Sequence, residues 1–135
     1  MSPLKRLALP LALLFTAAGL ATLGATAAPA HAAPPPTTIT GRVVDPITHA
    51  GVAGVVVTAR DVVALGTVYA RATSGPQGYF KLTGVTVEEV ATRFNGASVS
   101  YETGWLSCNR TVVPTWGQGC SNGTGWIGFI RIDHL

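Results

Sequence analysis

Three tryptophans and the polar residues between them form the part of this chain best suited to contact a ligand. The segment contains Trp105, Asn109, Trp116, Gln118, Asn122 and Trp126, interleaved with glycines. An indole ring presents a flat apolar surface that suits the C–H face of a sugar, and side-chain amides can bind the sugar hydroxyl groups. The segment therefore predicts a binding site for a glycan or a cell-wall component.

A structural role is the alternative interpretation of the same tryptophans, because large aromatic side chains also close the end of a small β-sandwich. Trp126 lies on a predicted strand, which favours a place in the core. Trp116 lies in a Pro-Thr-Trp-Gly loop, and loops often carry binding residues, so both interpretations stay open for it. In this alternative the protein is a structural or protein–protein interaction module, whose partner is a secreted or surface protein rather than a small molecule.

Residues for acid–base catalysis are few and scattered. Beyond the first 32 residues the histidines are His49 and His134, and no Gly-x-Ser-x-Gly motif offers a nucleophile. Asp45 begins a turn, where its carboxylate is expected to accept backbone N–H bonds. A small hydrolase would need His49 beside a carboxylate, and we predict no catalytic residue. The same side chains are too few to close a metal site, so we expect neither a metal ion nor a cofactor.

The first 32 residues have the features of a secretory signal peptide. Lys5 and Arg6 precede a mostly apolar stretch over residues 7–23, and Ala30-His31-Ala32 is a small-x-small cleavage site. A transmembrane anchor is the alternative, but the apolar stretch ends at a processing site rather than at a cluster of charges. We therefore expect cleavage near Ala32, a secreted (extracellular) protein, and no membrane span after cleavage.

Two cysteines in an exported chain predict one disulfide, between Cys108 and Cys120. The bond would close a loop of about a dozen residues and would stabilise the fold by roughly 3 kcal/mol. Two free thiols or a partial metal site are the alternatives.

Charge limits the classes of partner. Removal of Lys5 and Arg6 from the nine basic residues leaves seven, against six acidic residues. No cluster of Lys or Arg remains along the sequence, so we expect no nucleic-acid partner. Residues 33–38 form a proline-rich spacer, and residues 39–135 have the size of one domain, which we expect to be a monomer.

Alternation of apolar and polar residues predicts six strands. They are Thr38–Val44, Val55–Asp61, Thr67–Thr73, Tyr79–Leu82, Ala97–Tyr101 and Trp126–Ile132. Phe80 is expected in the core, and Trp126 is expected on the same face as Ile130. Residues 86–94 have helical spacing and predict one short helix or an irregular crossover. The pattern indicates an all-β fold, a small antiparallel β-sandwich.

The stretch from Ile39 to Leu82 resembles the carboxypeptidase regulatory-like domain, a transthyretin-like β-sandwich related to the starch-binding-like domains. That family opens with Gly-x-Val-x-Asp and then Thr-Gly-x-Pro-Leu-x-Gly-Ala-x-Val, and the matching residues here are Gly41, Val43, Asp45, Thr48, Gly54 and Val57. Ser74–Phe80 is similar to its Thr-Asp-x-x-Gly-x-Phe motif, and Val99–Trp105 is similar to its closing strand. The departures are His49 for Gly, Gly51 for Pro, Val52 for Leu and Gly75 for Asp.

The resemblance implies a small antiparallel Greek-key β-sandwich of about seven strands. It also implies an accessory module that stabilises an enzyme or binds glycans or partner proteins, and it supplies no catalytic residues. Together with the tryptophan segment, it predicts a secreted, non-enzymatic module that binds carbohydrate or a cell-wall component.

Overall fold

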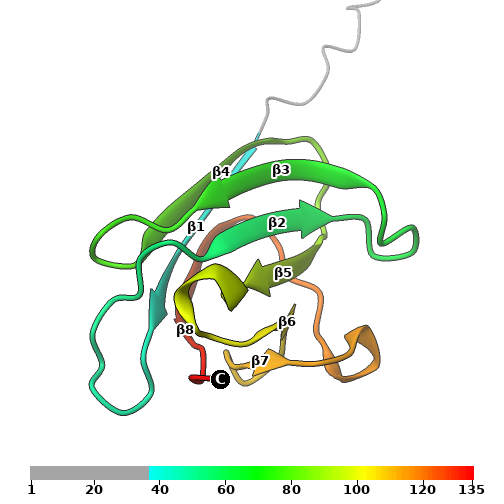
Figure 1. Ribbon diagram of the computed structural model, residues 1–135. Coiled ribbons are helices and arrows are strands. Elements are labelled where there is room, and N and C mark those ends of the chain that lie inside the picture. The colour runs from blue at the N-terminus through cyan, green and yellow to red at the C-terminus, as the bar shows by residue number, and fades with distance from the viewer. Residues whose placement is uncertain (1–36) are drawn as a thin grey trace, which may run out of the picture. The chain divides into compact units, whose positions relative to one another are not determined.

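The computed structural model describes residues 37–135, which form two β-sheets packed face to face (Figure 1). The predicted leader and most of the spacer lie outside the described residues. The strands are β1 (Thr37–Val44), β2 (Val56–Arg60), β3 (Val68–Thr73), β4 (Tyr79–Val85), β5 (Ala91–Asn95), β6 (Thr103–Leu106), β7 (Val112–Val113) and β8 (Gly125–Arg131). The all-β sandwich expected from the alternating pattern is confirmed.

The smaller sheet has the order β4-β1-β8, and the larger sheet has the order β3-β2-β5-β6-β7. All strand pairs are antiparallel except β1 and β8, which are parallel. The predicted antiparallel sandwich therefore contains one parallel pair, which the sequence pattern did not indicate. The physical reason is the crossover after β7: the chain leaves the larger sheet and enters β8 at Gly125, beside Ile39 near the start of β1.

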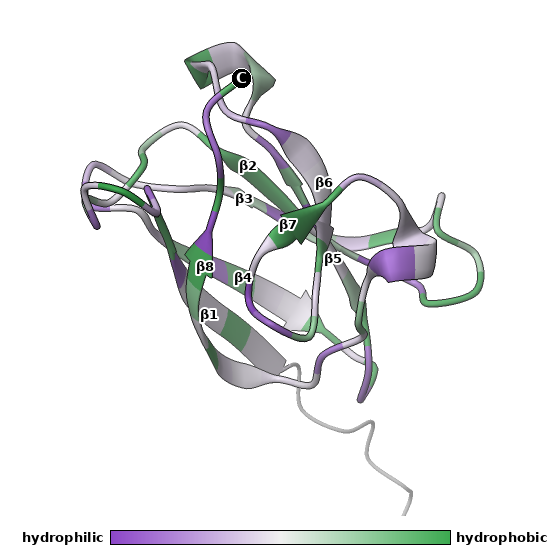
Figure 2. Ribbon diagram, turned by 90° about the horizontal axis from the view of Figure 1, so that it is seen from below, coloured by the Kyte–Doolittle hydropathy of each residue, from purple (hydrophilic) through white to green (hydrophobic). Residues whose placement is uncertain are grey.

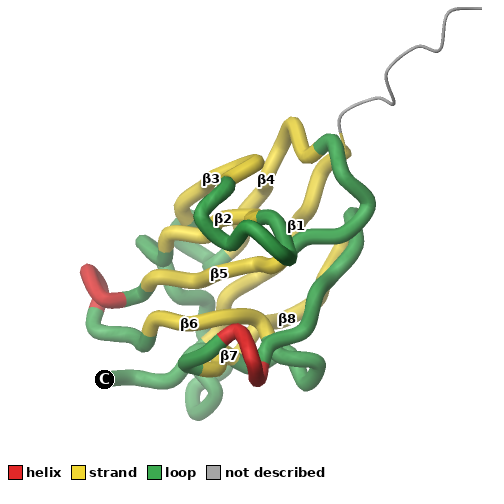
Figure 3. Tube along the Cα trace, turned by 90° about the vertical axis from the view of Figure 1, so that its right-hand side faces the viewer, coloured by secondary structure: helices red, strands yellow, loops and turns green. Residues whose placement is uncertain are grey.

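The possible helix over residues 86–94 is absent from the described part of the chain. Residues 86–90 form a loop that leads into β5, and Phe94 of this strand is fully buried. The apolar spacing suggested a helix because β5 is covered on both faces and so lacks the alternation of a half-exposed strand. Thr92, on the outward side, is also inaccessible, and its hydroxyl donates to Asn122. Helical elements within residues 37–135 are two 3-10 turns at the periphery, η2 (Ala97–Val99) and η3 (Trp116–Gln118) (Figure 3).

The strand predicted at Ala97–Tyr101 was also wrong, because this segment forms the connection between β5 and β6. Asn95 pairs with Thr103 across the two strands, and its side-chain oxygen accepts the backbone N–H of Ala97 at 3.2 Å. Ser100 then takes a left-handed conformation with φ 67°. Asn95-Gly96 thus begins a β-hairpin turn, and the next strand starts at Thr103 rather than at residue 97.

The core lies between the two sheets. Phe80 of β4 and Phe94 of β5 meet edge to face, with ring centroids 5.9 Å apart, so the predicted core position of Phe80 is confirmed. The other fully buried apolar side chains are Ile39, Val43, Val55, Val57, Ala59, Leu82, Val85, Ala91, Ile130 and Ile132. Hydrophobic and hydrophilic bands alternate along several strands in Figure 2, as expected where one face of a sheet is buried.

A β-bulge in β8 decides which side chains face outward. Thr40 of β1 pairs with Trp126, whereas Arg42 pairs with Phe129, so β8 carries one extra residue at this point. Gly128 takes the positive φ of 98° at the bulge, a conformation that favours glycine. The alternation reverses there, so Ile127 and Ile130 point inward and Trp126 points outward. The prediction that Trp126 shares the core face with Ile130 was wrong for this reason.

Neither 3-10 turn of residues 37–135 has the length or the apolar character of a membrane-spanning helix.

Candidate functional site

Three aromatic side chains lie exposed on the outer surface of the smaller sheet. They are Tyr79 of β4 and Trp126 and Phe129 of β8, with 51%, 52% and 55% of their surface accessible. The ring centroid of Trp126 lies 6.4 Å from that of Tyr79 and 5.7 Å from that of Phe129. We call these three residues the aromatic face. Exposed aromatic rings grouped in this way commonly mark an interaction site.

Strand register places basic and hydroxyl side chains among the rings. Arg42 of β1 lies between Tyr79 and Phe129 in one row, and Thr40 lies between Lys81 and Trp126 in the next. The guanidinium carbon of Arg42 is 5.1 Å from the centroid of the Tyr79 ring, a cation–π distance. The aromatic face therefore has hydrogen-bond donors within it as well as apolar surface.

A pocket of about 370 Å³ adjoins the aromatic face at Trp126. Its lining residues are Leu106, Ser107, Cys108, Arg110, Cys120, Ser121, Asn122, Gly123, Thr124, Trp126 and Ile127. Most of these residues come from the two ends of the disulfide-closed loop and from the crossover into β8. The pocket thus combines one indole edge with several hydroxyl groups and one guanidinium.

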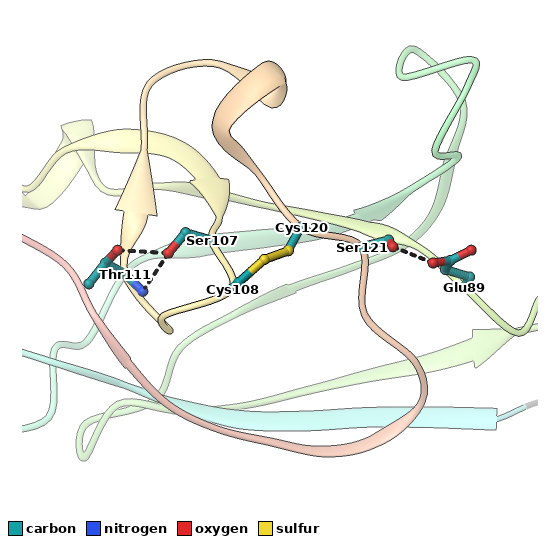
Figure 4. The surroundings of a disulfide bond; sticks show 6 residues. All are labelled: Glu89, Ser107, Cys108, Thr111, Cys120 and Ser121. Carbon is teal, nitrogen blue, oxygen red and sulfur yellow. Dashed lines mark hydrogen bonds between the residues drawn. A yellow bond between two sulfur atoms is a disulfide. The ribbon is translucent and has the colours of Figure 1, made fainter.

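The disulfide between Cys108 and Cys120 forms one wall of the pocket, and the predicted pairing is confirmed (Figure 4). The backbone N–H of Cys120 donates to the carbonyl of Leu106 at 2.8 Å, which holds the loop against β6. On one side the hydroxyls of Ser107 and Thr111 lie 2.7 Å apart, and on the other Ser121 donates to Glu89. These contacts fix both ends of the loop.

The three tryptophans do not form one site. Trp105 of β6 and Trp116 of η3 pack against each other on the larger sheet, with ring centroids 5.5 Å apart, and both are half-buried. Arg93 of β5 lies over the Trp105 ring at 5.7 Å. A Cβ atom placed on Gly119 would lie 2.6 Å from the Trp116 ring, so that indole is packed closely onto the loop backbone. Trp126 is separate, on the outer surface of the other sheet.

The predicted polar candidates Asn109, Gln118 and Asn122 do not all lie beside Trp126 either. Asn122 lines the pocket, but its amide already accepts a hydrogen bond from Thr92 at 2.6 Å and donates to the carbonyl of Gly123 at 3.0 Å. Gln118 is exposed on η3 and accepts from the Thr115 hydroxyl. The carbonyl of Asn109 accepts a bond from Arg131. Only Asn122 therefore lies beside Trp126, and it has a structural role there.

Asp45 caps the turn after β1, as predicted. Its Oδ1 accepts the backbone N–H groups of Ile47 at 2.8 Å and Thr48 at 2.9 Å, and these bonds lower the Asp45 pKa to about 2. Its Oδ2 accepts a bond from the Tyr101 hydroxyl at 3.0 Å and contacts Nε2 of His134 at 2.9 Å. Burial and the hydrogen bond to Asp45 raise the Tyr101 pKa.

The arrangement that a His49-based hydrolase requires is not present in the described residues. His49 stands exposed at a left-handed position of the loop, with φ 62°. Within residues 37–135 the carboxylate that contacts a histidine side chain is that of Asp45, and the histidine is His134. Sequence reasoning missed the contact of Asp45 with His134 because the two residues come from opposite ends of the domain. Their proximity arises only from the parallel pairing of β1 with β8, which carries His134 to the Asp45 turn.

The fold and the site define a small two-sheet β-sandwich with an exposed aromatic face on its smaller sheet. No protein-family model matches the chain, and no curated protein is detectably similar to it.

Proposed function

We propose that the protein is a non-enzymatic module that binds a polysaccharide through the aromatic face. The single observation that carries the proposal is the grouping of Tyr79, Trp126 and Phe129, each about half-exposed, on one open sheet surface. Large aromatic side chains left in water forgo the free energy of burial, and a sugar ring laid on them recovers part of it.

The surroundings of the rings support a sugar ligand over a purely apolar one. Arg42, Thr40 and Lys81 alternate with the rings through the strand register and can donate to hydroxyl groups at the ring edges. The adjoining pocket adds the hydroxyl of Thr124 and the guanidinium of Arg110 beside Trp126. A surface with apolar platforms and hydrogen-bond donors between them matches the two kinds of surface on a sugar.

Action outside the cytosol is part of the proposal. The disulfide supports it, because such bonds persist in oxidising compartments. The signal-peptide features of residues 1–32 support it from the sequence, and the resemblance to carboxypeptidase regulatory-like domains supports an accessory role rather than a catalytic one.

The test is a binding assay with matched tryptophan variants. The purified protein is incubated with insoluble cellulose, chitin and peptidoglycan, and soluble polysaccharides are titrated by calorimetry. We expect binding to at least one polymer and a loss of about tenfold or more in Trp126→Ala, because a central aromatic contact commonly contributes about 2 kcal/mol. Trp116→Ala, on the larger sheet, is the control and should bind normally.

Two results would count against the proposal. If no polysaccharide binds while crosslinking captures a discrete protein, the aromatic face is a protein-interaction surface instead. If Trp116→Ala removes binding and Trp126→Ala does not, the ligand lies at the Trp105–Trp116 pair.

A further inference from the structure

We infer that the polysaccharide bound at the aromatic face is anionic, and that a carboxylate or phosphate group on it binds between Arg42 and Arg131. The inference rests on the proposed function and names the class of sugar. A second pocket, of about 310 Å³, lies at the Phe129 end of the aromatic face and is lined by Arg42, Val44, His49, Phe129 and Arg131. We call it the arginine pocket.

Both guanidinium groups of the arginine pocket are held by backbone carbonyls. Nε of Arg42 donates to the carbonyl of Gln77 at 2.7 Å, and Nη2 of Arg131 donates to the carbonyl of Asn109 at 2.8 Å. A guanidinium has five N–H donors, so each group keeps donors for a ligand after this bond. The carbonyls orient the two groups without neutralising their charge, which is the preorganisation that bidentate binding of an oxyanion requires.

Among residues 37–135 no carboxylate lines the arginine pocket. Within residues 37–135 the one carboxylate within 4 Å of a basic side-chain nitrogen is that of Asp45, beside His134, so neither Arg42 nor Arg131 has a carboxylate partner in that range. Lys81, two residues after Tyr79 on β4, adds a further exposed cation to the same sheet surface. The acidic residues lie in turns, loops and β8's C-terminal extension: Asp45, Asp61, Glu88, Glu89, Glu102 and Asp133.

Basic residues also lie on the larger sheet, but in a different setting. Burial lowers the pKa of Arg60 there, and the nearby charges of Arg93 and Arg71 lower it further. The Arg60 side chain is bonded to the Thr58 hydroxyl and to the Leu65 carbonyl, and Arg93 lies over Trp105. The smaller sheet differs because its two arginines line one pocket together with the Phe129 ring.

The floor of the arginine pocket favours a sugar acid over a free ion. Val44 is almost fully buried, and Phe129 presents its ring beside the two arginines. Apolar walls reduce the local dielectric and strengthen the charge interaction. The backbone N–H of His49 donates to the carbonyl of Asp45 at 2.9 Å. This bond holds the loop so that His49 lies at the rim of the arginine pocket. A sugar ring can therefore stack on Phe129 while its acid group reaches both guanidiniums.

The experiment compares anionic with neutral polymers on the full chain. Calorimetric titrations use polygalacturonate for a carboxylate, a poly(glycerol phosphate) polymer for a phosphate, and xylan as the neutral polymer. We expect an anionic polymer to bind at least tenfold tighter than xylan. We expect Arg131→Gln and Arg42→Gln each to weaken that binding about tenfold, as for hydrogen bonds to charged groups. The stronger of the two anionic polymers identifies the acid group.

Arg71→Gln is the matched control, since Arg71 is an exposed arginine on β3 of the larger sheet. Arg131→Lys keeps the positive charge but removes the paired N–H donors of the guanidinium. Polysaccharide binding should therefore be as weak as in Arg131→Gln. Circular dichroism checks that every variant is folded. If Arg42→Gln does not fold, Arg131→Gln still tests the inference, because it leaves the contact between Arg42 and Tyr79 in place.

The outcomes separate this inference from the proposed function. Equal binding of xylan and the anionic polymers, with loss in Trp126→Ala and none in the arginine variants, overturns the inference and leaves polysaccharide binding intact. An equal loss in Arg71→Gln shows diffuse charge attraction and also overturns it. Tighter binding to single-stranded DNA or to phosphatidylglycerol vesicles than to either polymer overturns it as well. Absence of binding to all polysaccharides rejects both proposals.

Discussion

The carboxylate of Asp45 lies 2.9 Å from Nε2 of His134, although the two residues belong to opposite ends of the described chain. The ring of Tyr101 lies against the His134 ring, with centroids 4.1 Å apart, and its hydroxyl bonds the same carboxylate oxygen. The other oxygen caps the turn after β1. One carboxylate therefore connects the first loop, the β5–β6 connection and the segment after β8.

Acid should weaken the fold through Asp45. Its pKa of about 2 in the folded protein lies below the ordinary value of 3.8, so its contribution to stability is complete above about pH 4. That contribution is lost as the pH falls through about 2, because the protonated carboxyl no longer forms these bonds as an anion. Urea unfolding followed by circular dichroism between pH 2 and pH 7 measures the slope.

The variant Asp45→Asn keeps an oxygen for the turn and removes the charge. We expect it to be less stable than the wild type at pH 6 and nearly equal to it at pH 2. The exposed Glu88→Gln change is the control. A difference between Asp45→Asn and the wild type that is the same at every pH would contradict the assignment.

The bulge in β8 predicts a strong effect of Gly128→Ala. At φ 98° an alanine is strained, and its Cβ atom would lie 2.5 Å from Nη1 of Arg110. We expect a loss of about 1–3 kcal/mol in the free energy of unfolding. Gly66→Ala, where a Cβ atom meets nothing within 4 Å, is the control and should be close to neutral.

Reduction or removal of the disulfide should affect both stability and the Trp126 pocket. The double change Cys108→Ser and Cys120→Ser opens a loop with a sequence separation of 12, and we expect a loss of about 3 kcal/mol. The pocket wall formed by the bond becomes mobile, so polysaccharide affinity should fall as well. Chemical denaturation and calorimetry of the two forms check this, and unchanged affinity would show that the pocket takes no part in binding.

Fluorescence quenching can test the placement of the tryptophans without a ligand. Trp126 is about half accessible, whereas Trp105 and Trp116 shield each other. Acrylamide should therefore quench Trp126 most strongly, and Trp126→Phe should lower the overall quenching constant. A larger fall in Trp116→Phe would contradict the arrangement of the two clusters.

Local chemistry made much of the fold predictable from the sequence. The alternating pattern located β1 to β4 and β8 within a few residues, and Pro, Gly and Asp marked the turns. Asp45 was correctly predicted to cap its turn, and Phe80 was correctly placed in the core. Each of these predictions depends on a residue and its near neighbours, where steric and hydrogen-bonding preferences dominate.

The candidate site was harder to predict because it depends on pairing between distant strands. Tyr79 and Phe129 become neighbours only when β4 and β8 flank β1, and nothing in either strand alone specifies that order. The bulge at Gly128 then turned Trp126 outward against the alternation. The basic residues Arg42 and Arg131 form no cluster along the sequence, and they meet at one pocket for the same reason.

The parallel pairing of β1 with β8 sets the order in which the domain can fold during synthesis. Ile127, Ile130 and Ile132 complete the core that Ile39 and Val43 of β1 begin, so the interior stays open until the ribosome has made nearly the whole described chain. Contacts between such distant segments close slowly because of the entropy of the long intervening loop. The nascent chain therefore stays without a closed core until β8 has been made.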